Sequence, residues 1–163
     1  MMIETLDDLF LHTLRDVLYA ERRVFKALPK MERKATHAVL KKVISSHIEE
    51  TERHILRLEE VFDAMGKPAR GAKCDAIVGL IDEAEGLMAD GTDAETMDAA
   101  LISLVQAIEH YEIARYTSLV TWARQLGNPE AARLLRATLY DEHVALKVLT
   151  KMAERRVNAM AAA

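Results

Sequence analysis

Apolar residues recur along most of the chain at intervals of three and four, the spacing that gathers side chains on one face of an α-helix. One such series surrounds Glu21 and consists of Phe10, Leu14, Val17, Val24 and Leu28. No stretch of strand length alternates between apolar and polar residues, and the chain is rich in Ala, Leu, Glu, Lys and Arg. Both features predict an all-α protein.

Capping residues and glycines predict where the first two long helices begin and end. We expect the first to span about residues 4–34. Thr36 has the residue type that caps a helix N-terminus, so the second helix should begin there. It should end at Met65, because Gly66 is suited to the residue that follows a helix.

Capping residues, glycine and proline also delimit the helices in the second half of the chain. A short amphipathic helix is expected over residues 75–90, and residues 92–95 have the form of a capping box that opens the third long helix. That helix should end near Gly127. Asn128 is a capping residue followed by proline, so the fourth long helix should start there and run to about Asn158.

The lengths of the connections predict the topology. Short turns near Ala35 and Gly127 make two antiparallel helix hairpins. Residues 66–91 are far more than a tight turn needs, so this connector, with its short helix, can cross the length of a bundle. Long crossovers of this kind join the hairpins of ferritin-like four-helix bundles.

Four glutamates lie on or beside the apolar faces of the long helices, where leucine would be the ordinary residue. They are Glu21, Glu50, Glu112 and Glu142. If each hairpin folds at its turn, Glu21 stands level with Glu50, and Glu112 stands one residue from the level of Glu142. An unpartnered ionised carboxylate is too costly to bury, so a shared layer of four requires cations, protons or water.

Two further residues extend this layer into a candidate metal site. Glu109 lies one helical turn before Glu112, and His47 lies one turn before Glu50. Carboxylates with one imidazole suit iron or manganese, whereas zinc prefers more nitrogen or sulfur ligands. We expect two divalent ions, iron being favoured over manganese, because two such ions neutralise four glutamates.

Other readings of single residues stay open. A buried glutamate can pair with an arginine, and Arg115 and Arg136 are near enough along their helices to be considered. A histidine such as His54 can simply be hydrogen-bonded in the core. Whether His54, Asp141 or His143 contributes a metal ligand is not decided by the sequence.

Composition and charge exclude some classes of protein. The chain has 163 residues, half of them hydrophobic, and a net charge of −4. This length fits one domain, residues 1–163. Phosphate binding needs a clustered basic face, which the scattered lysines and arginines do not form, so we expect no nucleic-acid partner.

The sequence also bears on cellular location. The first ten residues include Glu4, Asp7 and Asp8 and lack the basic start and apolar run of a signal peptide. No stretch approaches the ~20 apolar residues of a membrane span. Cys74 is the single cysteine, which favours a free thiol in a reducing compartment. We therefore expect a cytoplasmic protein with no membrane partner.

Five stretches of the chain carry a family resemblance, namely residues 14–21, 27–31, 47–51, 57–62 and 108–114. They resemble the YciE/YciF-like stress-protein family of the ferritin-like superfamily. The resemblance covers nearly the whole chain and implies a helical bundle with a dinuclear metal centre, a homodimer, and a bacterial stress setting. It assigns ligands to Glu21, Glu50, Glu112 and Glu142, with Glu109 as in rubrerythrin-like sites. The chain departs from the superfamily's Glu-x-x-His motif, because Arg53 and Ala145 stand where that motif has histidine.

Two functions are compatible with these features. The first is a di-iron or di-manganese carboxylate protein that reacts with dioxygen or peroxide, which includes an oxidase or peroxidase activity. The second is a non-catalytic helical stress module that binds a partner or forms a dimer, with the acidic layer paired to arginines.

Overall fold

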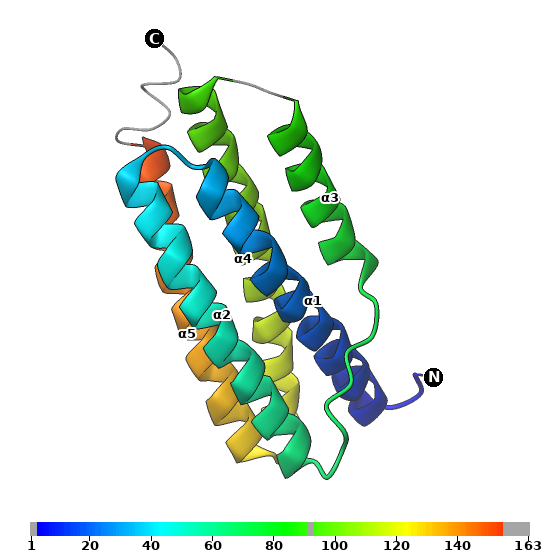
Figure 1. Ribbon diagram of the computed structural model, residues 1–163. Coiled ribbons are helices and arrows are strands. Elements are labelled where there is room, and N and C mark those ends of the chain that lie inside the picture. The colour runs from blue at the N-terminus through cyan, green and yellow to red at the C-terminus, as the bar shows by residue number, and fades with distance from the viewer. Residues whose placement is uncertain (1–2, 91–92, 155–163) are drawn as a thin grey trace.

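The computed structural model describes residues 3–90 and 93–154, and within them the chain forms five α-helices and no strand (Figure 1). The helices are α1 (Leu6–Lys34), α2 (Ala38–Ala64), α3 (Asp75–Ala89), α4 (Ala94–Gln125) and α5 (Pro129–Met152). The first two form one antiparallel hairpin and the last two form another. Together these four make the bundle, and α3 packs outside it against α1 and α4. The predicted ferritin-like four-helix bundle is confirmed.

Most predicted helix boundaries agree with the structure to within two residues. The exceptions fall near residues that the structure does not describe. The predicted capping box includes Thr92, which lies outside the described residues, while Asp93 caps α4 by accepting hydrogen bonds from two backbone amides of its first turn. The predicted end of the last helix at Asn158 also lies outside the described residues.

The prediction that Thr36 caps α2 is wrong. The residue at the N-cap is His37, and its side chain makes no capping hydrogen bond. Asp98 of α4 takes that role instead, because its carboxylate accepts from Thr36 N at 2.7 Å, His37 N at 2.8 Å and Thr36 Oγ1 at 2.6 Å. A carboxylate is well suited to this place, since the N-terminus of a helix carries partial positive charge. Asp98 thus ties the α1–α2 turn to the second hairpin.

The long connector between α2 and α3 lies along α1 (Figure 1). Its Ala72 N donates a hydrogen bond to the carbonyl oxygen of Arg15 at 3.0 Å. At the preceding residue, a Cβ added to Gly71 would come within 3.1 Å of Tyr19 N, closer than a side chain ordinarily allows. Glycine therefore suits this close approach, because a larger residue would require one of the two segments to shift slightly. The contact brings the chain back along the bundle to start α3.

The apolar core is divided into two clusters along the bundle. One surrounds Leu28, Leu40 and Leu101 near the α1–α2 turn, and α3 packs against it. The other surrounds Phe10, Phe62 and Leu135 near the α4–α5 turn, together with further residues of all four long helices. No helix in the described part of the chain combines the length and hydropathy needed to cross a membrane.

Candidate metal centre

A layer of buried ionisable side chains lies between the two apolar clusters. We call it the polar layer, and it consists of Glu21, His47, His54, Glu109, Glu112 and Glu142. Each side chain sits among the apolar residues of its own helix face, and each residue is at most 3% exposed. All four long helices contribute: α1 gives Glu21, α2 the two histidines, α4 two glutamates and α5 Glu142.

The polar layer contains two groups of side chains that could hold a metal ion. The first group is His47, Glu109, Glu112 and Glu142, and the second is Glu21, His54 and Glu142. Within each group, one ligand atom of every residue lies within 4.8 Å of the others. Glu142 belongs to both groups, so it lies where the two groups meet.

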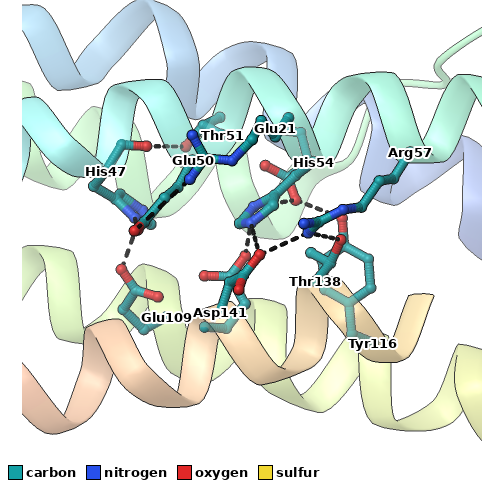
Figure 2. Close-up of polar contacts among 12 residues, drawn as sticks. Glu21, His47, Glu50, Thr51, His54, Arg57, Glu109, Tyr116, Thr138 and Asp141 are labelled. Atoms are coloured by element: carbon teal, nitrogen blue, oxygen red, sulfur yellow. Dashed lines mark hydrogen bonds and ion pairs between the residues drawn. The ribbon is translucent and has the colours of Figure 1, made fainter. Parts of the chain in front are cut away.

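Two close contacts within the layer join histidines to glutamates (Figure 2). His47 Nε2 lies 3.1 Å from Glu109 Oε1, and His54 Nδ1 lies 3.0 Å from Glu142 Oε1. These atoms are near each other but not aligned as hydrogen bonds, so both ring nitrogens of each histidine and both oxygens of each of these glutamates have no hydrogen-bond partner. Buried polar atoms are normally satisfied. A converging set that is not satisfied fits the oxygen and nitrogen ligands of a transition-metal site.

Burial and mutual repulsion dominate the electrostatics of α4's two glutamates. Burial raises the pKa of Glu109 well above its ordinary value, and the charges of Glu142, Glu21 and Glu50 raise it further. Burial likewise raises the pKa of Glu112, and so do the charges of Glu21, Glu142 and Glu109. Without a cation, these two carboxyls therefore keep their protons to higher pH than an exposed glutamate does.

His54 provides positive charge inside the layer. Burial alone would lower its pKa, but the neighbouring Glu21 and Glu142 outweigh burial and raise it to about 10. Burial would raise the pKa of Glu142, but the contact with His54 outweighs burial and lowers that pKa below its ordinary value. His54 and Glu142 thus form a buried ion pair in the metal-free protein.

Glu50 lies at the rim of the polar layer and not inside it. Its side chain is 28% exposed, 3.6 Å from His47 Nδ1 and 4.0 Å from Arg53. It belongs to neither compact group of ligand atoms, although its charge raises the pKa of Glu109. Of the six residues that sequence placed in the site, five lie buried together and Glu50 borders them.

The surroundings of His54 could not be deduced from the sequence. Its Nε2 lies 3.5 Å from Asp141, whose carboxylate accepts a hydrogen bond from Arg57 at 2.6 Å (Figure 2). Tyr116 donates a 2.5 Å hydrogen bond to Glu21 from the other side of the layer. His54 is four residues from Glu50, and this helical spacing was the available signal. His143 is exposed and lies away from the layer.

The two arginines considered as partners for the buried glutamates are elsewhere. Arg115 is exposed and lies over the ring of Tyr111, 5.3 Å from its centroid. Arg136 is also exposed. The ion pairs that the structure gives to Glu21, Glu109 and Glu142 are with His47 and His54.

The stability of the metal-free protein is expected to fall as pH rises from about 5 to about 9. Glu109 and Glu112 have folded pKa values above the ordinary 4.5, and His54 has a folded value of about 10 against 6.5, so the folded state binds more protons across this range. Glu142, with its lowered pKa, acts oppositely only at more acidic pH. Melting curves in the presence of a chelator measure the trend. A melting temperature that rises over this range would contradict the electrostatics described above.

Comparison with known proteins agrees with this architecture. Residues 5–162 match the family described as Domain of unknown function (DUF892). Protein YciF of Escherichia coli (strain K12) is 38% identical over 159 residues, which cover 97% of this chain and 96% of YciF. The crystal structure of this E. coli stress protein has a TM-score of 0.91, covering 96% of this chain and 99% of that one.

Two further solved structures share the fold. YcfI of Rhodopseudomonas palustris is 44% identical, with a TM-score of 0.89 over 91% of this chain and 94% of that chain. A protein from Xanthomonas campestris (XCC3681) is 23% identical, with a TM-score of 0.74 over 94% of each chain, and so supports the fold alone. With a family match over nearly its full length and an extensive likeness to YciF, the chain belongs to the DUF892 family and is a YciF-like protein.

Proposed function

We propose that the polar layer binds two divalent metal ions, iron or manganese, and that the protein serves a redox or metal-handling role in stress. The observation that carries this proposal is the set of buried, unsatisfied carboxylate and imidazole atoms that converge from four helices. Four buried glutamates carry four negative charges when ionised, and two divalent ions would neutralise them. Bundles with dinuclear sites place their ligands on facing helices in this way.

The two groups of side chains suggest how the ligands divide. His47, Glu109 and Glu112 would hold one ion, Glu21 and His54 the other, and Glu142 would contact both. Glu50, which was expected as a ligand, would act from the exposed rim beside His47. Tyr116 would fix the orientation of Glu21 through its hydrogen bond.

The chain around the layer would control what reaches it. A bound iron or manganese pair would supply electron transfer to a small oxidant, dioxygen or peroxide. The two apolar clusters on either side keep bulk water from the buried carboxylates, which strengthens every charge interaction among them. His54 holds a proton on its ring between Glu21 and Glu142. Asp141, whose side chain is partly exposed, lies beside the other nitrogen of that ring.

We expect ~2 metal ions per chain at full loading, the number held by dinuclear bundle sites. The protein would be purified without chelators, or stripped and reconstituted anaerobically with Fe(II) and Mn(II), and its metal content measured by mass spectrometry. Protein treated with chelator serves as the control. Absence of bound transition metal after reconstitution with both ions would refute the proposed centre.

A non-catalytic role is the second candidate. The observation that favours it is the description of the similar YcfI as a candidate structural protein. On this view the chain acts by dimer formation or by binding a partner, and the polar layer has no metal. The homodimer is itself a proposal, which light scattering of the purified protein tests, and the metal measurement above separates the two functions.

A further inference from the structure

A pocket of about 150 Å³ connects the surface with one side of the polar layer. It lies between α2, α4 and α5. At its mouth, Val144 is 45% exposed and Val148 is 39% exposed, whereas at its floor His47 is 3% exposed and Glu109 is fully buried. A molecule that entered from solvent would therefore meet the two valines and the partly exposed Glu50 before it reached His47.

The walls of this pocket are mostly apolar. Their apolar residues include Val43, Ile44, Val105, Ala145, Val148 and Leu149, and the exposed Ser46 adds one hydroxyl group. An apolar cavity of ~150 Å³ is large enough to hold benzene. The size and lining of this pocket therefore fit a small ring or a short branched chain, which would remain in contact with aliphatic side chains.

The floor of the pocket, unlike its mostly apolar walls, is formed by polar side chains. Both ring nitrogens of His47 and both carboxylate oxygens of Glu109 lack hydrogen-bond partners, although these residues are almost completely buried. Glu50 places a further carboxylate in the pocket lining. The Glu50 carboxylate is 28% exposed, accepts hydrogen bonds and repels anions, so this end of the pocket favours an uncharged ligand with a donor group.

We propose that this pocket is the substrate site of the protein and takes a small, uncharged, largely apolar molecule that carries one hydroxyl group. The apolar part would occupy the aliphatic walls, and the hydroxyl would donate to the carboxylate of Glu50. The substrate role rests on the proposed function, because the pocket ends at residues of the proposed metal centre. Binding itself depends on the pocket alone and can be measured with or without metal.

Phenol, benzene and benzoate are the probes that test this proposal. They share a ring and differ in the group that would face the floor. The full chain is titrated with each probe, and binding is followed by calorimetry and by NMR. Phenol should bind at least about tenfold more tightly than benzoate, whose charge the carboxylate repels. Phenol should also bind more tightly than benzene, because it makes one hydrogen bond to a charged acceptor. Benzoate binding as tightly as phenol would overturn the proposal, and so would the absence of phenol binding.

A pair of matched variants locates the binding. Val148→Phe narrows the mouth of the pocket, whereas Val39→Phe makes the same change at a valine of α2 that is 53% exposed and does not line it. Phenol affinity should fall at least about tenfold in V148F and stay unchanged in V39F. Ala145→Leu, which fills the pocket from its wall, should repeat the loss. Equal phenol affinity in V148F, A145L and the parent would overturn the proposal.

Metal analysis of the same samples distinguishes this inference from the proposed function. Phenol binding at the pocket in a protein that takes up no metal would support the pocket and refute only the metal centre. Full metal loading without phenol binding would refute only the pocket. V148F should keep the parent's metal content, because Val148 belongs to neither group of candidate ligands.

Discussion

Saturation of the metal-free protein with Fe(II) or Mn(II) is expected to raise its melting temperature by about 8–16 °C. A ligand that binds only the folded state at ~1,000 times its dissociation constant adds ~4 kcal/mol, and each kcal/mol corresponds to ~2–4 °C for a chain of this size. The physical source is the polar layer, where the ions would replace repulsion among Glu109, Glu112 and Glu142 by attraction. Differential scanning calorimetry under anaerobic conditions measures the shift.

The pH dependence provides an internal check on this result. Metal ligands must be deprotonated, so the ions would displace protons from Glu109 and Glu112 and the shift in melting temperature should grow with pH. The metal-free protein itself is expected to become less stable as pH rises over the same range. A melting temperature that does not respond to either metal at any pH would contradict binding in the layer.

Replacement of Glu112 by glutamine is expected to reduce metal affinity by at least ~100-fold, because loss of a residue that merely orients a ligand can already cost ~10–100-fold. Stability without metal should be unchanged below about pH 4.5 and higher at neutral and alkaline pH, because only the parent must take up a proton at residue 112 on folding there. The reason is that Glu112 has a strongly raised pKa, so an uncharged amide resembles the form that the folded chain already prefers. Metal titration and melting of the variant with and without chelator test both parts.

Glu49→Gln is the matched control for this substitution. Glu49 is exposed on α2 outside the polar layer, so the same loss of charge there should change neither metal affinity nor stability appreciably. If instead Glu112 were half of a structural ion pair, its replacement would strand a buried partner and destabilise the metal-free protein by ~3–5 kcal/mol. That loss, together with full metal content, would reject Glu112 as a ligand.

The sequence predicted most of the polar layer because helical periodicity reports burial directly. Glu21, Glu112 and Glu142 stand within apolar series, and the structure buries all three. Glu50 stands at the edge of its series, and the structure leaves it at the rim. Periodicity gives the face of a helix on which a residue lies, but it does not give the contacts that the residue makes with other helices.

Contacts between distant residues account for what the sequence did not predict. His54 enters the layer because Glu21 of α1 and Glu142 of α5 flank it, and no local pattern encodes that meeting. Thr36 resembles a capping residue, yet Asp98, 62 positions away, supplies the carboxylate for the start of α2. In both cases the partner comes from another helix, so the pairing depends on how the hairpins dock.

The division of the core into two apolar clusters has an evolutionary consequence. Hydrophobic burial, the main source of stability, is concentrated at the two ends of the bundle, while the ionisable side chains occupy the segment between them. Aliphatic residues in such clusters tolerate exchange at constant volume. Selection can therefore change the ionisable side chains of the middle segment, and with them the chemistry proposed for it, while the ends keep the helices in register. One scaffold of this kind can serve descendants with different chemistry.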